Sequence, residues 1–94
     1  MLYWTNWNQQ HPTIERSFMN GTQRQVIVQE NLVMPHGLAL DLHRQRIYWA
    51  NNLHFGSFRI ERSSMDGSDR QLVYSGSGQF IFSLTVNLYN KKGR

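Results

Sequence analysis

Apolar side chains along this chain gather in short stretches rich in β-branched and aromatic residues, each about the length of one β-strand. None of these stretches places its apolar residues at the 3.6-residue spacing of an amphipathic helix. The pattern therefore predicts an all-β chain. The predicted strands are 2–5, 14–18, 24–28, 38–42, 47–50, 57–63, 70–74 and 80–88. Loops are predicted at 11–12, 34–35, 51–52 and 75–78, where Pro, Asn, Gly and Ser interrupt the pattern.

Much of the sequence occurs twice, at an offset of 45 residues that becomes 46 after a one-residue insertion. The matched segments are 2–6 with 47–51, 14–17 with 60–63, 19–25 with 65–71 and 37–41 with 83–87. A period in the mid-forties combined with short strands is typical of β-propeller blades, each of which is a four-stranded antiparallel sheet.

Two tight hairpin turns are predicted at equivalent places in the repeat. Asn20–Gly21 and Asp66–Gly67 are dipeptides that readily adopt positive φ at both central positions of a two-residue turn.

Composition and charge narrow the possible functions. A length of 94 residues accommodates one small domain, and 39% hydrophobic with 13% aromatic residues indicates a packed fold. The net charge is +4, but three of the ten basic residues are Lys91, Lys92 and Arg94 at the C-terminus. The rest of the chain has seven basic residues against six acidic ones, so no nucleic-acid partner is predicted.

Several other site classes lack the residues they need. The chain has no cysteine, which excludes disulfides, thiolate zinc sites and a cysteine nucleophile. No apolar run exceeds four residues, so this segment is not expected to insert into a membrane, and its first residues do not form a secretory signal.

The repeated motifs resemble the low-density lipoprotein (LDL) receptor class B repeat, also called the YWTD repeat, over residues 2–88. The string 3–12 looks most like the large LDL receptor-related proteins. This resemblance implies a six-bladed β-propeller on the extracellular side of a single-pass endocytic receptor, next to EGF-like modules. The motif positions are Tyr3, Trp4, Thr5 and Asn6 in the first copy and Tyr48, Trp49, Ala50 and Asn51 in the second.

On the family's blade plan the chain is a partial YWTD propeller: about one whole four-stranded blade plus parts of two neighbours. Residues 1–30 form an incomplete blade, 37–75 a full blade, 80–88 the first strand of the next blade and 89–94 a basic tail. Such a fragment cannot close a propeller alone, so its open edges are expected to contact the remaining blades or to self-associate.

The chain departs from the family motif at four positions. Asn6 and Asn51 replace the usual Asp, which keeps an oxygen acceptor, adds NH₂ donors and removes the charge. A hydrogen-bonding role between strands or blades is therefore still expected. Ala50 replaces Thr, and Ser83 replaces Gly.

No pattern of residues indicates catalysis, phosphate binding or a cofactor, so the chain is not expected to be an enzyme. Glu15 and Glu61 are expected to form ion pairs on a solvated face with Arg16, Arg62 or cross-strand partners. No pair of histidines has metal-ligand spacing, so no metal site is predicted.

The four histidines are candidates for sensing acidification, because an imidazole typically gains charge between pH 7.4 and about 5.5. They are His36, His11, His43 and His54, with His36 favoured because it lies in the repeat motif. The alternative is that all four are solvated loop residues without a role.

The aromatic residues divide into two groups. Those at matched positions, the Tyr and Trp of the two motifs, are expected to pack within and between blades. Trp7, Phe55 and Phe58 lie outside the matched set and are candidate contacts for a protein ligand. Separately, Asn20–Gly21–Thr22 is an N-glycosylation sequon, which makes Asn20 a candidate for carrying a glycan in a secreted protein.

The expected function is that of a non-enzymatic binding module from the propeller of an LDL receptor-related receptor, taking part in protein-ligand binding or acid-dependent release. The alternatives are a nidogen-like propeller of the basement membrane and a truncated fragment with no independent function.

Overall fold

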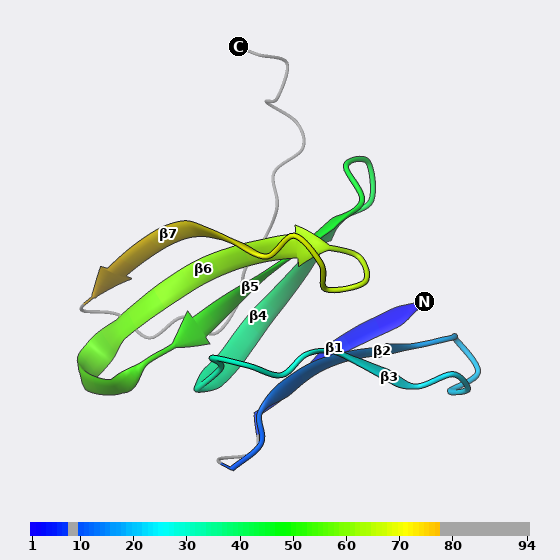
Figure 1. The fold of residues 1–94 in the computed structure, drawn as a ribbon, viewed down its shortest axis with the longest axis horizontal. Coiled ribbons are helices and arrows are strands. Elements are labelled where there is room, and N and C mark those ends of the chain that lie inside the picture. The colour runs from blue at the N-terminus through cyan, green and yellow to red at the C-terminus, as the bar shows by residue number, and fades with distance from the viewer. Residues whose placement is uncertain (8–9, 78–94) are drawn as a thin grey trace.

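The computed structural model describes residues 1–7 and 10–77, apart from the side chain of Phe55. These residues form two antiparallel sheets that lie side by side, with β1 next to β4 (Figure 1). The first sheet has the order β1 (Leu2–Asn6), β2 (Thr13–Ser17) and β3 (Gln25–Val28). The second has the order β4 (Met34–Asp41), β5 (Arg46–Asn52), β6 (Ser57–Ser64) and β7 (Gln71–Ser77). A short 3₁₀ helix, η1 (His54–Gly56), precedes β6.

The predicted all-β fold is confirmed, with one four-stranded antiparallel blade beside a three-stranded neighbour. The expected strand 80–88, the matched segment 83–87 that includes Ser83, and the basic tail 89–94 lie outside the described residues. No helix within residues 1–7 and 10–77 is long and apolar enough to cross a membrane.

Three predicted loops are wrong because their residues lie inside strands. Pro35 belongs to β4, where it pairs with Asn51. Since β4 lies at the edge of its sheet, a residue without an N–H is tolerated there. Asn52 ends β5, and the run 75–77 continues β7.

The two hairpin turns contain three residues rather than the predicted two. The Gly21 amide donates to the Phe18 carbonyl at 2.9 Å, and the Gly67 amide donates to the Ser64 carbonyl at 3.0 Å. Among the three residues of each turn only the glycine has positive φ, at 86° for Gly21 and 91° for Gly67, while Asn20 and Asp66 do not. A methionine before each Asn or Asp lengthens the loop, which favours a turn that ends in one left-handed glycine.

The two sequence copies pair their strands in the same register. Tyr3 lies opposite Arg16 and Trp4 opposite Glu15 in the first sheet. Their repeat equivalents Tyr48 and Trp49 lie opposite Arg62 and Glu61 in the second. The repeat in the sequence is therefore a repeat of structure.

The hydrophobic core lies between the sheets. Ile47 and Trp49 of β5 are fully buried and form one cluster with Ile14 and Val28 of the first sheet. Tyr3 packs against the same cluster, as expected for a framework residue. Further partly buried residues at its border are Ile27, Leu32, Leu38 and Met65. Packing between blades therefore holds the two sheets together.

Candidate protein-binding face

A charged unit recurs on one face of each sheet. The Arg24 guanidinium donates to Glu15 at 2.8 Å and lies 5.6 Å from the centre of the Trp4 ring. Arg70 donates to Glu61 at 2.7 Å and lies 5.6 Å from the Trp49 ring. Each unit places a carboxylate, a guanidinium and an indole on the same face of its sheet.

The predicted setting of the two glutamates is therefore partly wrong. Their partners are Arg24 and Arg70 across the sheet, and both carboxylates are buried rather than solvated. Arg16 and Arg62 do not pair with them, because alternation along β2 and β6 directs these arginines to the opposite face. There they donate to the side chains of Gln25 and Gln71.

The environment of Glu15 changes its ionisation. Burial raises the pKa of this carboxyl, but the hydrogen bonds from Arg24 and Thr13, the charge of Arg24 and a hydrogen bond from Asn6 outweigh burial. The pKa of Glu15 therefore lies below its ordinary value.

We expect this ionisation to make the fold sensitive to acid. Because the pKa of Glu15 is lower in the folded state, its contribution to stability is complete above the unfolded-state pKa. That contribution is lost as the pH falls through the folded-state pKa. Urea denaturation followed by circular dichroism should show a steeper loss of stability below about pH 4.5 in the wild type than in Glu15→Gln. Parallel pH profiles for the two proteins would contradict this assignment.

Asn51 clamps the segment that links the two sheets. Its Oδ1 accepts hydrogen bonds from the backbone amides of Val33 and Met34 at 2.9 and 3.2 Å, and its Nδ2 donates to the Asn31 carbonyl at 3.0 Å. The side chain is fully buried. The hydrogen-bonding role expected for Asn51 is therefore found, and the amide's donor is used as well as its acceptor.

The clamped segment lines a pocket at the end of the sheets where β1 ends and β4 begins. The pocket has a volume of about 410 Å³ and is lined by Trp7, Leu32, Val33, Met34 and His54. The Trp7 side chain is 46% exposed, and its ring centre lies 5.0 Å from that of His36, with the two planes tilted by 49°. The structure thus brings three of the predicted candidates, Trp7, His36 and His54, to one place.

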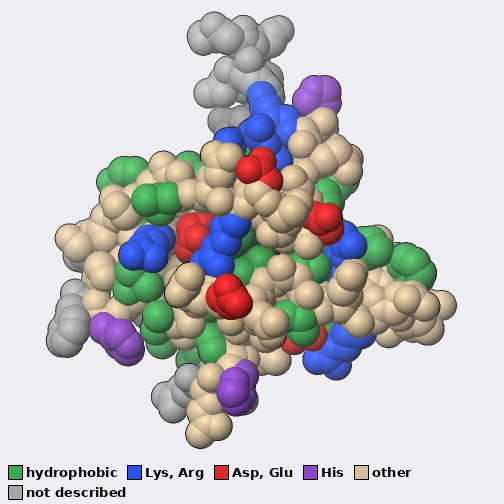
Figure 2. Space-filling view, viewed as in Figure 1, with side chains coloured by type: hydrophobic (Ala, Val, Ile, Leu, Met, Phe, Trp, Pro, Cys, Tyr) green, Lys and Arg blue, Asp and Glu red, His purple; other side chains and the backbone are tan. Residues whose placement is uncertain are grey.

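The other candidate histidines do not line this pocket. His11 follows Trp7 in the β1–β2 loop, while His43 lies in the β4–β5 turn at the opposite end of the sheet. Figure 2 shows histidine side chains at the lower edge of the view and at its top, and acidic and basic side chains interspersed between them. Phe58 does not fit a ligand-contact role, because it is buried and packs against Tyr74. The side chain of Phe55 lies outside the described residues.

The linker residues Leu32, Val33 and Met34 were missed as site residues by sequence reasoning. They fall between the matched segments of the repeat, and a short apolar run alone does not distinguish a pocket wall from a strand. Within the part of the chain that the structure describes, no group of three or more His, Asp or Glu could hold a metal ion.

Asn20 occupies an exposed turn at the other end of the sheets. Its Oδ1 accepts hydrogen bonds from the Thr22 amide at 3.1 Å and the Thr22 hydroxyl at 2.7 Å. Asp66 forms the same bonds with Ser68, and these hydrogen bonds lower the pKa of Asp66. The sequon is therefore accessible, and its two polar residues are in contact.

Comparison with known proteins agrees with this architecture. Residues 1–42 match the family described as low-density lipoprotein receptor repeat class B. Protein cueball of Drosophila yakuba is 46% identical over 85 residues, which cover 90% of this chain and 13% of that protein. Protein cueball of Drosophila virilis is 39% identical over 85 residues, which again cover 90% of this chain and 13% of that protein. The chain thus spans about an eighth of the length of these relatives.

A solved structure shows the same fold. A chain in the crystal structure of a Nidogen/Laminin complex superposes with a TM-score of 0.77 at 32% identity, over 90% of this chain and 31% of that chain. The match in fold and the match in sequence agree: residues 1–42 belong to the low-density lipoprotein receptor class B (YWTD) repeat family, and the described residues have the fold of part of a β-propeller.

Proposed function

We propose that this chain is a non-enzymatic protein-binding module, whose ligand contacts the pocket formed by Trp7, the linker 32–34 and His54. The observation that carries the proposal is the half-exposed indole of Trp7, which lines a pocket together with the apolar side chains of residues 32–34. Aromatic side chains beside such pockets supply a large share of binding energy in protein interfaces. The Asn51 clamp supports this role, because a fixed backbone lowers the entropy cost of binding.

The parent that we propose is the extracellular part of an LDL receptor-related endocytic receptor, with EGF-like modules beside the propeller. Membership of the class B repeat family supports an extracellular setting. An N-linked glycan on the accessible Asn20 would fit the same setting. Acid-dependent release is part of the same proposal, and its candidate groups are His36, whose ring lies beside the indole of Trp7, and His54, which lines the same pocket.

The second candidate is a propeller of the extracellular matrix. It is favoured by the structural similarity to a chain in the Nidogen/Laminin complex. Laminin is therefore a direct probe: saturable binding of laminin to this chain would favour the matrix function over the receptor function.

The binding site can be tested without knowledge of the natural ligand. Peptides would be selected from a phage-displayed library on the immobilised chain and their affinities measured by isothermal titration calorimetry. Trp7→Ala is expected to weaken their binding by about thirtyfold, because removing a central aromatic contact costs about 2 kcal/mol. Binding is also expected to weaken between pH 7.4 and 5.5, and to do so less in a His36→Gln, His54→Gln double variant.

The matched control is Leu42→Ala. Leu42 is also exposed and apolar, but it lies in the β4–β5 turn at the other end of the sheet. Equal losses for Trp7→Ala and Leu42→Ala would show that the selected peptides do not recognise this pocket.

A further inference from the structure

The sequon at residues 20–22 lies in a hairpin turn that is closed by two backbone hydrogen bonds. The Gly21 amide donates to the Phe18 carbonyl at 2.9 Å, and the Phe18 amide donates to the Thr22 carbonyl at 2.9 Å. Asn20 therefore stands at the tip of the turn between β2 and β3. It is also the one asparagine of the sequence that is followed two positions later by Ser or Thr.

The side-chain nitrogen of Asn20 is not used by the fold. The Oδ1 atom accepts hydrogen bonds from the amide and the hydroxyl of Thr22. Within residues 1–7 and 10–77, Nδ2 of this exposed side chain donates no hydrogen bond. A Cβ on the neighbouring Gly21 would meet nothing within 4 Å. A sugar attached to Nδ2 therefore breaks no hydrogen bond of the turn and has room beside it.

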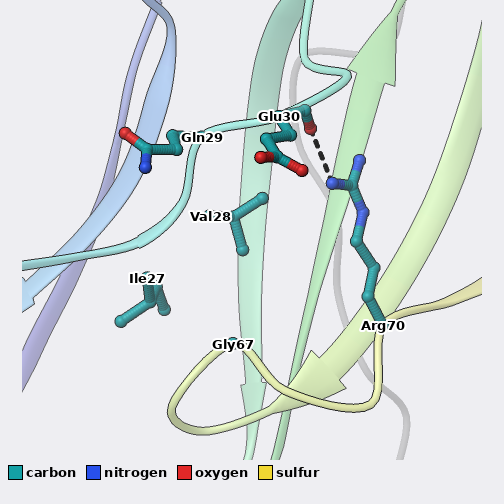
Figure 3. A pocket seen from close by; sticks show the side chains of 6 residues that line it. All are labelled: Ile27, Val28, Gln29, Glu30, Gly67 and Arg70. Atoms are coloured by element: carbon teal, nitrogen blue, oxygen red, sulfur yellow. Dashed lines mark hydrogen bonds between the residues drawn. The ribbon is translucent and has the colours of Figure 1, made fainter.

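The second copy of the repeat shows that this position stays exposed when another sheet packs against the turn. Asp66 is the repeat equivalent of Asn20, and its turn lies at the junction between the sheets, where Figure 3 shows Gly67 beneath Ile27. Asp66 is exposed all the same. The exposure of Asn20 is thus a property of the turn, and it does not depend on what packs against the first sheet.

Asn20 and the pocket beside Trp7 lie at opposite ends of the first sheet. In the antiparallel pair of β1 and β2, Leu2 lies opposite Ser17. The turn of Asn20 follows Ser17, so it lies near the first residue of β1, whereas Trp7 follows the last residue. A glycan on Asn20 therefore starts about the length of β1 away from the pocket.

We propose that Asn20 is an N-glycosylation site, and that its glycan leaves the pocket at the other end of the sheets open to the protein ligand. The proposal rests on the proposed extracellular setting, because this modification belongs to secreted proteins. In the reaction, Nδ2 attacks C1 of a sugar carried on a polyprenyl diphosphate. The N–C1 bond forms, the C1–O bond breaks with its electron pair on the diphosphate, and a base of the transferase takes one Nδ2 proton.

The test is expression of the 94-residue chain behind a cleavable secretory signal in cultured animal cells. Secreted and cell-retained chain are both analysed by mass spectrometry before and after treatment with peptide N-glycosidase, so poor secretion does not hide the result. We expect one N-linked oligosaccharide, whose removal converts Asn20 to Asp. Asn20→Gln and Thr22→Val are expected to lose the glycan, whereas Thr22→Ser keeps the hydroxyl and is expected to retain it.

Asp66→Asn tests the argument from the repeat, because it creates the pattern Asn-Gly-Ser in the equivalent turn. This variant is expected to carry two glycans. The proposal would be overturned by an unmodified wild type, by a glycan that persists in Thr22→Val, or by an Asp66→Asn chain without a second glycan.

Peptide binding separates this proposal from the proposed function. The peptides selected on the chain are expected to bind its glycosylated and its enzymatically deglycosylated forms with equal affinity. If the glycosylated form alone failed to bind them, the placement of the glycan away from the pocket would be wrong. A chain without a glycan that still binds the peptides at Trp7 would overturn this inference and leave the binding function intact.

Discussion

Replacing Gly67 by alanine is expected to lower the free energy of unfolding by about 2–5 kcal/mol, which is enough to unfold most of a small domain. Gly67 has a φ of 91°, where a side chain is strained. In addition, a Cβ at this position would overlap the Ile27 carbonyl oxygen and lie 2.9 Å from its carbon. Because these are backbone atoms, the clash is relieved only by moving the two sheets apart.

Gly21→Ala is the matched control for this prediction. Gly21 has nearly the same φ, 86°, but open space around its Cα. Its replacement should therefore lower the free energy of unfolding only by the backbone strain of a side chain at positive φ, about 1–2 kcal/mol. Both variants should be measured by urea denaturation followed by circular dichroism under the same conditions. Equal losses in the free energy of unfolding would show that backbone strain in the turn, and not the clash with Ile27, destabilises Gly67→Ala.

Asn51→Ala is expected to lower the free energy of unfolding by about 2–4 kcal/mol, because it leaves two backbone amides without their acceptor and removes one of the two hydrogen bonds of the Asn31 carbonyl. The atoms removed are Oδ1, which accepts from the Val33 and Met34 amides, and Nδ2, which donates to the Asn31 carbonyl. The variant should also speed hydrogen exchange at the Val33 and Met34 amides, which are direct reporters of the clamp.

Asn6→Ala provides the control for Asn51→Ala, since Asn6 holds the same motif position but is exposed. Its replacement is expected to lower the free energy of unfolding by about 1 kcal/mol, because the exposed Asn6 side chain gives up only its hydrogen bond to Glu15. Asn51→Asp gives a second comparison, because a carboxylate keeps the acceptors and loses the donor to Asn31. If Asn51→Ala and Asn6→Ala lowered the free energy of unfolding by the same small amount, the linker would not depend on the hydrogen bonds of Asn51.

The fold was largely predictable because its signals are local. Strand-length apolar stretches predicted β1–β3 and β5–β7 to within a few residues, and the repeat predicted that both sheets would be built alike. The β4 strand starts earlier than predicted, since Met34 and Pro35 pair with β5 despite the proline. That pairing depends on Pro35 lying at a sheet edge, which only the topology shows.

The candidate site was predictable only in part. Trp7, His36 and His54 were each selected from the sequence, but their proximity depends on how β1, β4 and η1 meet at one end of the sheets. Phe58 was selected by the same reasoning and is buried, because β7 covers it with Tyr74. Neither outcome could be read from local patterns, since each depends on residues far apart in the chain.

The sequence by itself determined the all-β class, the repeat of about 45 residues and the glycine turns, because strand alternation and backbone φ preferences act over a few residues. Only the tertiary structure decided which copy of each motif is buried. Leu2 and Ile47, or Arg24 and Arg70, occupy equivalent positions in the repeat and differ in exposure. The physical reason is that burial of these positions requires a sheet packed against them, and within residues 1–7 and 10–77 the first sheet packs against these positions of the second.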